Sequence, residues 1–472
     1  MNVKLRESQL DKFFNPRSVV VIGASNAQFN LGATICTCLR EYIKFPGHSY
    51  AVNRKGEAVS GCPGYASVDQ LPETPDLAVV ITPAPVVPRF VKKCGEKGIR
   101  NIIIESAGFS EQGDQGAVLQ GEINEYIKRY GIRILGPNCL GVLDTHSRFC
   151  CFYGAYQGII DVFGKRGGVS YIIQSGGVGV IIIESLMDDI QGINKMVSIG
   201  NKSDVDEADL MEYFNHDNTG VIAMYLENVV QGQKLMNAAR RISKPILVFK
   251  SGRTAEGTAA ALSHTAGMAN NDAVFDSACR QAGIIRLKSI SELHSMPKML
   301  TEMPLLKNNR IAAFTNSGAF GSIAADLMID AGLNMPRLAP ETRERLRKLG
   351  GVFNLNNPVD IGPALPQVYL DIFEILLSAG EVDGLLLMSS IWRDFIIDVM
   401  KELVKMCKRY DKPAAIYAPN SVAKILSVRR QFGLPLFDTM EEAVRALVVS
   451  HQQFRYLRKK EIPYGADHKE SS

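Results

Sequence analysis

The sequence lacks a long uninterrupted apolar run, a strong net charge and a secretory leader pattern. Its most apolar stretch, GGVSYIIQSGGVGVIIIESL, is interrupted by Gln174, Ser175 and several glycines, so it predicts a buried strand, a turn and a helix rather than a membrane span. The first residues, MNVKLRESQLDKFF, carry charges where a signal peptide needs an apolar core. The net charge is only +4 and no long basic run occurs, so the sequence does not indicate a nucleic-acid surface.

Cysteines with metal-ligand spacing are also missing. The sequence has nine cysteines, and the tight pairs, Cys36/Cys38 and Cys150/Cys151, do not have CxxC spacing. We therefore expect no metal to be bound by this chain. An odd number of cysteines without a disulfide framework is typical of a reducing compartment, so we expect a cytoplasmic protein.

What the sequence does contain is an alternation of short β-branched runs with longer helical stretches, which is typical of parallel α/β domains. A chain of 472 residues predicts about three domains. From the composition of the connecting segments we expect domains at 1–145, 146–303 and 304–460, followed by a polar tail at 461–472. The expected strands lie at 18–25, 77–82, 101–106, 169–175, 220–227, 245–251, 311–317, 384–390 and 414–419.

The first expected strand runs into a small-residue turn from Gly23 to Ser25, and a helical segment follows. Glycine lets the backbone approach a phosphate, and the helix start supplies N–H donors. The turn is not a GxGxxG motif, and the next strand leads to the basic pair Arg54-Lys55 instead of the acidic residue of an NAD site. These basic residues suit a ligand with additional phosphates, such as coenzyme A or NADP. The alternative is a Rossmann-like unit with a solvated basic turn.

Two later turns share the pattern [QN]-S-G-x-x-G between an expected strand and an expected helix. The first contains Ser175 and Gly176, and the second contains Ser317 and Gly318. We interpret them as equivalent positions in two similarly folded domains. A helix start preceded by small residues binds anions through its backbone N–H groups, so two such turns can hold one phosphate between them. The alternative is close packing of strand and helix that merely requires glycine.

A single histidine, His264, lies in a run of small residues, ALSHTAGMAN, without the spacing of a metal site. The run follows an expected strand and a loop with Lys250 and Arg253. A neutral imidazole nitrogen near cations and helix starts is suited to carry a phosphoryl group, and a carboxylate is the usual partner of its other nitrogen. Glu227, at the end of the strand at 220–227, offers that carboxylate. The alternative is a structural histidine and a surface glutamate.

The segment SIGNKSDVDEADLMEYF, at 198–214, is acidic and therefore raises the question of cation binding. It lacks EF-hand spacing, with no glycine at the sixth loop position. We interpret it as a loop that caps a helix at Asp204 or Asp206.

Taken in order, these segments resemble the α subunit of the NDP-forming acyl-CoA synthetases, also called ADP-forming acetate–CoA ligases, of the succinyl-CoA synthetase superfamily. The resemblance covers about residues 8–455. It implies an N-terminal Rossmann-like CoA-binding domain followed by two flavodoxin-like parallel-sheet domains. The segments that carry it are VVVIGAS, VNRKGE, DLAVVITPAPVVP, ESAGFSEQG, GPNCLGV, QSGGVG, VSIGNKSDVDEADLMEYF, YLE, SHTAG, AFTNSG and NPVDIG.

The resemblance also implies a mechanism. Family members convert acyl-CoA and phosphate into acyl phosphate and free CoA. The acyl phosphate phosphorylates a histidine, which passes the phosphoryl group to ADP on an ATP-grasp domain. By motif, the histidine and its stabilising carboxylate correspond to His264 and Glu227, and the phosphate-binding helix starts contain Ser175, Gly176, Ser317 and Gly318. The positions expected to bind CoA are Gly23, Ser25, Lys55 and Asn138.

The three expected domains account for the whole chain, and no ATP-grasp motif is apparent. The resemblance therefore implies that the Mg-nucleotide binds to a separate ATP-grasp β subunit in a hetero-oligomer, with the overall reaction acid + CoA + NTP ⇌ acyl-CoA + NDP + phosphate. Ala266 and the pair Ala319-Phe320 depart from the glycine-rich family pattern. Three alternatives stay open: a non-catalytic CoA- or acyl-CoA-binding regulatory paralogue, a component of a protein acetyltransferase and, last, an NADP-dependent oxidoreductase, for which the glycine fingerprint is missing.

Overall fold

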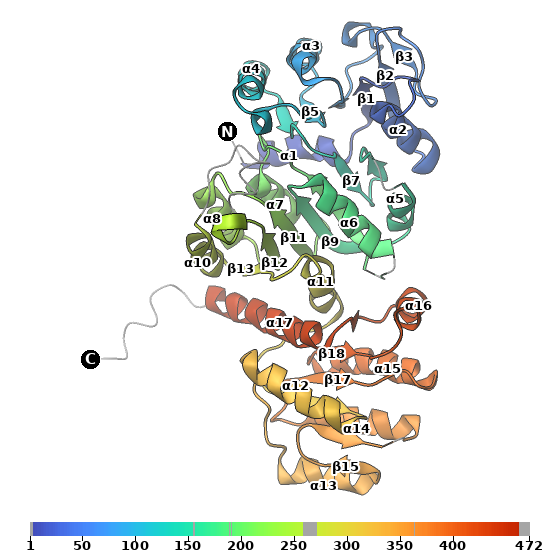
Figure 1. Cartoon of the computed structure of the whole chain (residues 1–472), viewed down its shortest axis with the longest axis vertical. Coiled ribbons are helices and arrows are strands. Elements are labelled where there is room, and N and C mark those ends of the chain that lie inside the picture. The colour runs from blue at the N-terminus through green and yellow to red at the C-terminus, as the bar shows by residue number, and fades with distance from the viewer. Residues whose placement is uncertain are drawn as a thin grey trace, which may run out of the picture. The chain divides into compact units, whose positions relative to one another are not determined.

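The computed structural model describes residues 3–153, 156–187, 189, 191–257, 271–362 and 364–461. The chain divides into two compact units, one made of residues 1–187 and 191–288 and the other of residues 188–190 and 289–472. In the described residues, unit 1 holds two sheets and unit 2 holds one, each sheet being flanked by helices (Figure 1).

The first sheet of unit 1 is parallel and has the strand order β3-β2-β1-β4-β5-β6. This is the order of a Rossmann fold, and the direction of winding reverses between β1 and β4. The central strands are runs of Val, Ile, Leu and Ala that are fully buried, as a sheet covered on both faces requires. The strands are β1 (Ser18–Ile22), β2 (His48–Val52), β3 (Gly64–Tyr65), β4 (Leu77–Val80), β5 (Asn101–Ile104) and β6 (Arg133–Leu135).

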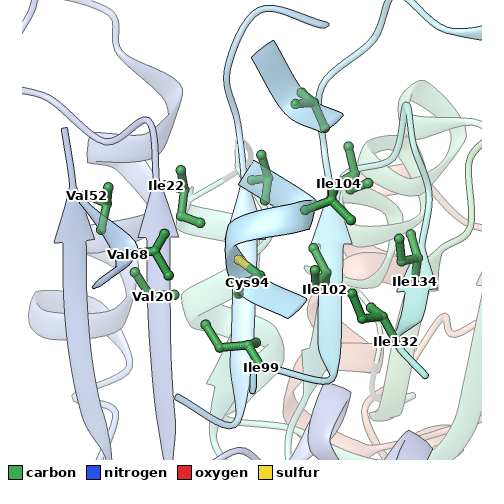
Figure 2. Packing of buried hydrophobic residues seen from close by; sticks show 14 of the residues in the cluster. Val20, Ile22, Val52, Val68, Cys94, Ile99, Ile102, Ile104, Ile132 and Ile134 are labelled. Carbon is green, nitrogen blue, oxygen red and sulfur yellow. The ribbon is translucent and has the colours of Figure 1, made fainter. Parts of the chain in front are cut away.

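The core of this sheet is a cluster of aliphatic side chains between the strands and two helices (Figure 2). Val20 and Ile102 of the strands share it with Cys94 of α3 and Ile123 of α4, and all four are fully buried. Each buried aliphatic side chain contributes about 1.5–3 kcal/mol, so the cluster fixes the sheet on which the loops after the strands are displayed. The helices of this part are α1 (Val3–Phe14), α2 (Leu31–Thr37), α3 (Val87–Lys97) and α4 (Asp114–Tyr130).

The second sheet of unit 1 has the order β13-β12-β11-β9-β10-β7-β8. Its five parallel strands, β9 to β13, follow the flavodoxin-like order 2-1-3-4-5, and β7 and β8 add an antiparallel edge. The winding therefore reverses between β9 and β11. The strands are β7 (Val142–Asp144), β8 (Phe149–Cys150), β9 (Arg166–Ile173), β10 (Ile193–Ser198), β11 (Val221–Leu226), β12 (Ile246–Lys250) and β13 (Ile284–Arg286). The helices are α5 (Tyr156–Phe163), α6 (Gly176–Met187), α7 (Glu207–Asn215), α8 (Gly232–Arg241) and α10 (Asp272–Ala282).

Unit 2 repeats this topology in a sheet of order β15-β16-β14-β17-β18-β19. Its parallel strands again follow 2-1-3-4-5, with β15 antiparallel at the edge, so the winding reverses between β14 and β17. The strands are β14 (Ile311–Thr315), β15 (Val352–Asn354), β16 (Val359–Ile361), β17 (Gly384–Met388), β18 (Ala414–Tyr417) and β19 (Leu436–Phe437). The helices are α11 (Glu292–Glu302), α12 (Gly318–Asp330), α13 (Pro340–Leu349), α14 (Pro366–Ser378), α15 (Phe395–Tyr410), α16 (Val422–Phe432) and α17 (Met440–Glu461).

The fold class expected from the sequence is confirmed: one Rossmann-like sheet is followed by two flavodoxin-like sheets. All nine expected strands are present, as β1, β4, β5, β9, β11, β12, β14, β17 and β18. The boundaries at 145 and 303 stay predictions, and near them β7 pairs in the second sheet while α11 falls in unit 2. Among the described helices, none is both long enough and apolar enough to cross a membrane.

Candidate active site

The winding reversal of the second sheet brings two of the expected site segments together. β9 and β11 are hydrogen-bonded neighbours, with Ile173 opposite Tyr225. β9 leads through Gln174 and Ser175 into α6, whereas β11 leads into Glu227. In open α/β sheets, ligands bind outside the carboxyl ends of the strands at such a reversal point. The structure therefore places the first small-residue turn and the expected carboxylate at one edge of one sheet.

Ser175 and Gly176 form the start of helix α6, as expected. The Gly179 N–H donates to the Ser175 carbonyl at 3.1 Å, which closes the first turn. A Cβ at Gly176 would lie 2.9 Å from Cγ of Leu140, so glycine is needed for this close approach. The first N–H groups of a helix have no intrahelical acceptor and carry the positive end of the helix dipole, so this start can receive a phosphate oxygen.

Glu227 is half-buried directly after β11. Its backbone N–H donates to Oε1 of Gln174 at 2.8 Å, which connects the carboxylate turn to the residue before Ser175. Burial, and to a smaller extent the neighbouring Glu227 carboxylate, raises the pKa of Tyr225. The carboxylate thus lies beside a hydroxyl that stays protonated at neutral pH and can donate to it.

His264 lies outside the described residues, as does the small-residue run around it. The strand that leads toward it, β12, ends at Lys250, whose side chain is buried. The Lys250 ammonium donates to the Ser251 carbonyl at 2.9 Å, and burial lowers the pKa of this lysine. The approach to the histidine run therefore starts at the same edge of the sheet as Glu227, because β12 is the parallel neighbour of β11.

The second small-residue turn starts helix α12 in unit 2. Asn316 donates to Oγ of Ser389 at 3.2 Å across the winding reversal between β14 and β17, and Ser317 is the N-cap residue of the helix. A carboxylate already faces this helix start, because a Cβ at Gly318 would lie 3.4 Å from Oδ2 of Asp360. Burial raises the pKa of Asp360. Whether both helix starts hold one phosphate stays a prediction.

The turn after β1 shows why glycine is required at position 23. Gly23 has φ +103°, and a Cβ there would lie 2.2 Å from the Ile81 carbonyl oxygen. The turn is closed by Asn30, whose Oδ1 accepts from the Ser25 N–H at 3.0 Å and whose Nδ2 donates to the Gly23 carbonyl at 3.1 Å. Asn30 also caps helix α2. Sequence reasoning missed this residue, although an Asn before a helical run is an N-cap signal.

Lys55 projects from the loop after β2, and its side chain is 76% exposed. Asn53 folds this loop by accepting from the N–H groups of Lys55 at 3.2 Å and Glu57 at 3.1 Å. The loop is joined to the turn after β1 by Asn26, which donates to the Ala58 carbonyl at 3.0 Å. The structure therefore brings the Gly23 turn and the Lys55 loop side by side at the carboxyl edge of the first sheet.

Asn138 follows β6, which lies three strands away from β1 in the sheet order β1-β4-β5-β6. It adopts φ +60°, and its N–H donates to the Ser106 carbonyl at 2.9 Å. Its side chain contacts Oδ1 of Asn201 at 3.5 Å. Asn138 is thus placed where the first sheet meets the acidic segment of the second, apart from Gly23 and Lys55.

The acidic segment has a larger role than the expected helix cap. Asp206 caps α7 with a complete capping box, as expected for one of the two candidates. Asp204 instead accepts from Nε of Arg133 at 2.7 Å and from the Ile134 N–H at 2.9 Å, both on β6 of the first sheet. The segment therefore fastens the two sheets of unit 1 to each other. Across the described ranges, no group of three or more His, Cys, Asp or Glu residues is placed to hold a metal ion.

Comparison with known proteins defines the class to which this fold and site belong. A family model described as a CoA binding domain matches residues 17–145, and one described as a succinyl-CoA ligase like flavodoxin domain matches residues 166–300. A CoA-binding sheet followed by a flavodoxin-like ligase sheet is the architecture of the acid–thiol ligases that use CoA.

Individual relatives specify the family. The chain is 37% identical over 383 residues to the alpha subunit of ADP-forming acetate–CoA ligase II of Pyrococcus furiosus, covering 80% of this chain and 81% of that one. It is 38% identical over 369 residues to an ADP-forming acetate–CoA ligase of Methanocaldococcus jannaschii, covering 77% of this chain but 50% of that one. A solved structure also matches: dinucleotide forming acetyl-coenzyme A synthetase 1 of Ca. Korarchaeum cryptofilum, in complex with phosphate and ADP. The match covers 96% of this chain and 98% of that chain, with a TM-score of 0.86 and 29% identity. The chain belongs to the family of the ADP-forming acetate–CoA ligase α subunits, and the resemblance drawn from its sequence is confirmed.

Proposed function

We propose that this chain catalyses the thioester half of an NDP-forming CoA ligase reaction. A phosphate oxygen attacks the thioester carbon of an acyl-CoA, the C–S bond breaks, and the sulfur leaves as a thiolate that takes up a proton to give CoA. A ring nitrogen of His264 then attacks phosphorus, the bond between phosphorus and the acyl oxygen breaks, and the acid leaves as a carboxylate. Each step is reversible, so the same groups serve synthesis of the thioester.

This proposal rests on one observation: the start of α6 and the Glu227 carboxylate lie together where the winding reverses between β9 and β11. An anion-receiving helix start, at Ser175 and Gly176, lies beside a carboxylate, Glu227, connected to it by one side-chain hydrogen bond. In the proposal the helix start holds the phosphoryl group, and the carboxylate accepts from the second ring nitrogen of His264. A carboxylate in that position increases the nucleophilicity of the imidazole and stabilises its cation. Ser317 and Gly318 are proposed as the second phosphate-binding helix start.

CoA is proposed to bind along the carboxyl edge of the first sheet. Gly23 and Ser25 would contact its phosphates through the backbone, and Lys55 would neutralise phosphate charge. Asn138 would lie farther along the edge, on the side of the second sheet, where the thiol arm has to go to reach Ser175. The matching CoA-binding family supports the ligand, and the adjacent Gly23 turn and Lys55 loop support its placement.

The nucleotide half is proposed to reside on an ATP-grasp β subunit that binds Mg-nucleotide. The name of the Pyrococcus furiosus relative, an alpha subunit, supports a separate partner. The Methanocaldococcus jannaschii relative is about twice the matched length, so the subunit arrangement varies among relatives. The nine cysteines are free and buried, which supports a reducing, cytoplasmic location.

The test uses the purified chain, a panel of acyl-CoAs and labelled phosphate, with and without an ATP-grasp subunit. We expect acid-labile, base-stable label on His264, located by mass spectrometry, and none in His264→Ala. His264→Ala should retain the affinity of the parent chain for CoA. Absence of label even with the partner would refute the proposal in favour of a non-catalytic CoA-binding paralogue, and the acyl-CoA that gives label would identify the acid.

A further inference from the structure

The turn that carries Glu227 is held by side chains from two other parts of unit 1. Gln174 makes three of these contacts. Its Oε1 accepts from the N–H groups of Glu227 at 2.8 Å and Asn228 at 3.2 Å, and its Nε2 donates to Oδ1 of Asn228 at 3.0 Å. Gln174 is itself buried, at 6% exposure, so these bonds are shielded from competing water. One side chain next to the phosphate-binding helix start therefore fixes both the backbone and the side chain of the carboxylate turn.

The fourth contact comes from Lys202 in the acidic segment before α7. Its ammonium donates to the Asn228 carbonyl at 2.8 Å and pairs with Oε2 of Glu207 at 3.1 Å. The Lys202 side chain is 2% exposed and that of Glu207 is 4% exposed. β9 and β11 are neighbouring strands and α7 contacts β9 (Figure 1), so the turn after β11 is held by Gln174, which follows β9, and by Lys202, which precedes α7.

The placement of Lys202 makes two unfavourable contributions to the free energy of folding. A buried ion pair loses the hydration of both charges and returns little net stability unless further hydrogen bonds satisfy them. Lys202 also has φ +57°, a left-handed conformation that costs a non-glycine residue on the order of 1 kcal/mol or more. Neither cost is needed to cap α7, because Asp206 does that with its own side chain. The feature of Lys202 that the cap does not explain is its bond to the Asn228 carbonyl.

From this geometry we propose that Gln174 and Lys202 are positioning residues for Glu227. They hold the Glu227–Asn228 turn at a fixed distance from the helix start at Ser175, so that the carboxylate meets the histidine at the place where the phosphoryl group is bound. This inference rests on the proposed role of Glu227 as the partner of His264. It gives the segment at 198–207 a part in the phosphoryl transfer that its sequence alone does not reveal.

The mechanism of action is geometric and does not involve contact with substrate. Misplacing a catalytic group by about 1 Å reduces a rate by as much as about 100-fold. Without Lys202, the Asn228 carbonyl would lose its partner and Glu207 would be left as a buried uncompensated charge. Without the Gln174 side chain, two backbone N–H groups of the turn would lose their acceptor. Either change would release the turn while leaving the CoA-binding edge of the first sheet in place.

The test is a double-mutant cycle between Lys202→Met and Glu227→Gln. The measured quantity is the rate at which His264 is phosphorylated from saturating acyl-CoA and phosphate, with the affinity for CoA and the melting temperature recorded for each variant. If Lys202 acts through Glu227, Lys202→Met lowers the rate about 10- to 100-fold in the parent chain. In the Glu227→Gln background it lowers the rate by less than about twofold, because the positioned group is already absent.

Lys234→Met is the matched control. Lys234 pairs with Asp206 and Asp209 at the same end of α7, at 2.9 and 2.8 Å, and the contacts described for its ammonium are with these two carboxylates. We expect its rate to stay within about twofold of the parent. Gln174→Asn is the second variant, to be used where Lys202→Met does not fold. It shortens the side chain by one methylene, and we expect the same pattern of rate loss in the same two backgrounds.

The outcomes separate the inference from the function on which it rests. An equal loss from Lys202→Met in both backgrounds, or a parallel loss of CoA affinity, would show a general structural role and overturn the inference. A Glu227→Gln variant with the parent rate would instead remove Glu227 from the mechanism, and the positioning role would fall with it. Label on His264 in that variant would still uphold the histidine as the phosphoryl carrier.

Discussion

His294 in unit 2 makes the stability of that unit depend on pH. The residue lies in α11 and faces a group of charged side chains, Lys298 of the same helix, Asp189, Arg429 and Asp438. Burial, and then the positive charge of Lys298, lowers the pKa of His294 to about 4, while the two aspartates act in the opposite direction. The histidine is therefore neutral in the folded protein at any pH above about 4.

The sign and size of the effect follow from proton linkage. A histidine in the unfolded chain has a pKa near 6.5, so between pH 6.5 and pH 4 the unfolded state binds a proton that the folded state does not. Stability is therefore unaffected above the unfolded value and falls as the pH decreases through this window. With a folded pKa of about 4, the expected loss from about pH 7.5 to about pH 5 is about 2 kcal/mol.

The single tryptophan of the chain, Trp392, provides the assay because it lies in unit 2. Its ring packs edge-on against Phe395 at 5.7 Å, so its fluorescence reports the unfolding of this unit in urea. The free energy of unfolding is measured at both pH values for the parent chain and for His294→Gln, which cannot take up a proton. Contributions of other groups, such as Asp360 with its raised pKa, cancel in the difference. We expect the variant to lose about 2 kcal/mol less than the parent, and an equal loss in both proteins would refute the reasoning.

Three further predictions concern the phosphate site, the CoA site and the first sheet. Asp360→Asn should lower the KM for phosphate about two- to fivefold, because a carboxylate no longer faces the start of α12. The KM of the parent chain should itself fall as the pH decreases and Asp360 takes up a proton. An unchanged KM in the variant would contradict this prediction. Lys55→Ala should weaken binding of CoA about tenfold but that of dephospho-CoA much less, as measured by calorimetry, whereas equal weakening would place Lys55 away from the phosphate. In α4, Gly116→Ala should destabilise unit 1 by about 1–3 kcal/mol, because its Cβ would lie 1.8 Å from the Phe109 carbonyl oxygen. On the same helix, the Cβ added by Gly121→Ala would have no neighbouring atom within 4 Å, so this variant should stabilise unit 1 by about 0.5–1 kcal/mol. Similar melting temperatures for the two variants would count against this prediction.

The sheets could be predicted from the sequence because each central strand is a short run of β-branched residues bounded by turn residues. The run VVVI at 19–22 became part of β1, NIII became β5 and VSYII at 169–173 became the buried part of β9. The antiparallel edge strands β7 and β8 were missed because three and two residues carry no measurable periodicity. β7 forms because β10 offers an open edge, and β8 pairs in turn with β7, so both depend on another part of the chain.

The candidate site could be predicted only as a set of strand ends. Ser175 and Glu227 were placed after two strands by local pattern, and the strand order then brought them together. The contribution of Lys202 could not be predicted in this way, because its bond to Asn228 joins residues 26 positions apart and depends on how α7 packs. Likewise, Asp204 looked like a helix cap but binds Arg133, 71 positions away, because β6 of the first sheet approaches it. Local sequence predicts elements well, whereas the connections between them depend on tertiary packing.

The two winding reversals share one topology but differ in the polar contacts of their turns. At the reversal between β9 and β11, both the oxygen and the nitrogen of the Gln174 amide bond to the turn that carries Glu227. At the second, the equivalent Asn316 donates to Ser389, and Asp360 already faces the helix start. A phosphate proposed to bind at the start of α12 would therefore meet the negative charge of Asp360 when that carboxylate is ionised. If Ser317 and Gly318 bind phosphate as we propose, removal of the Asp360 carboxylate is expected to strengthen that binding, which is the outcome that Asp360→Asn tests.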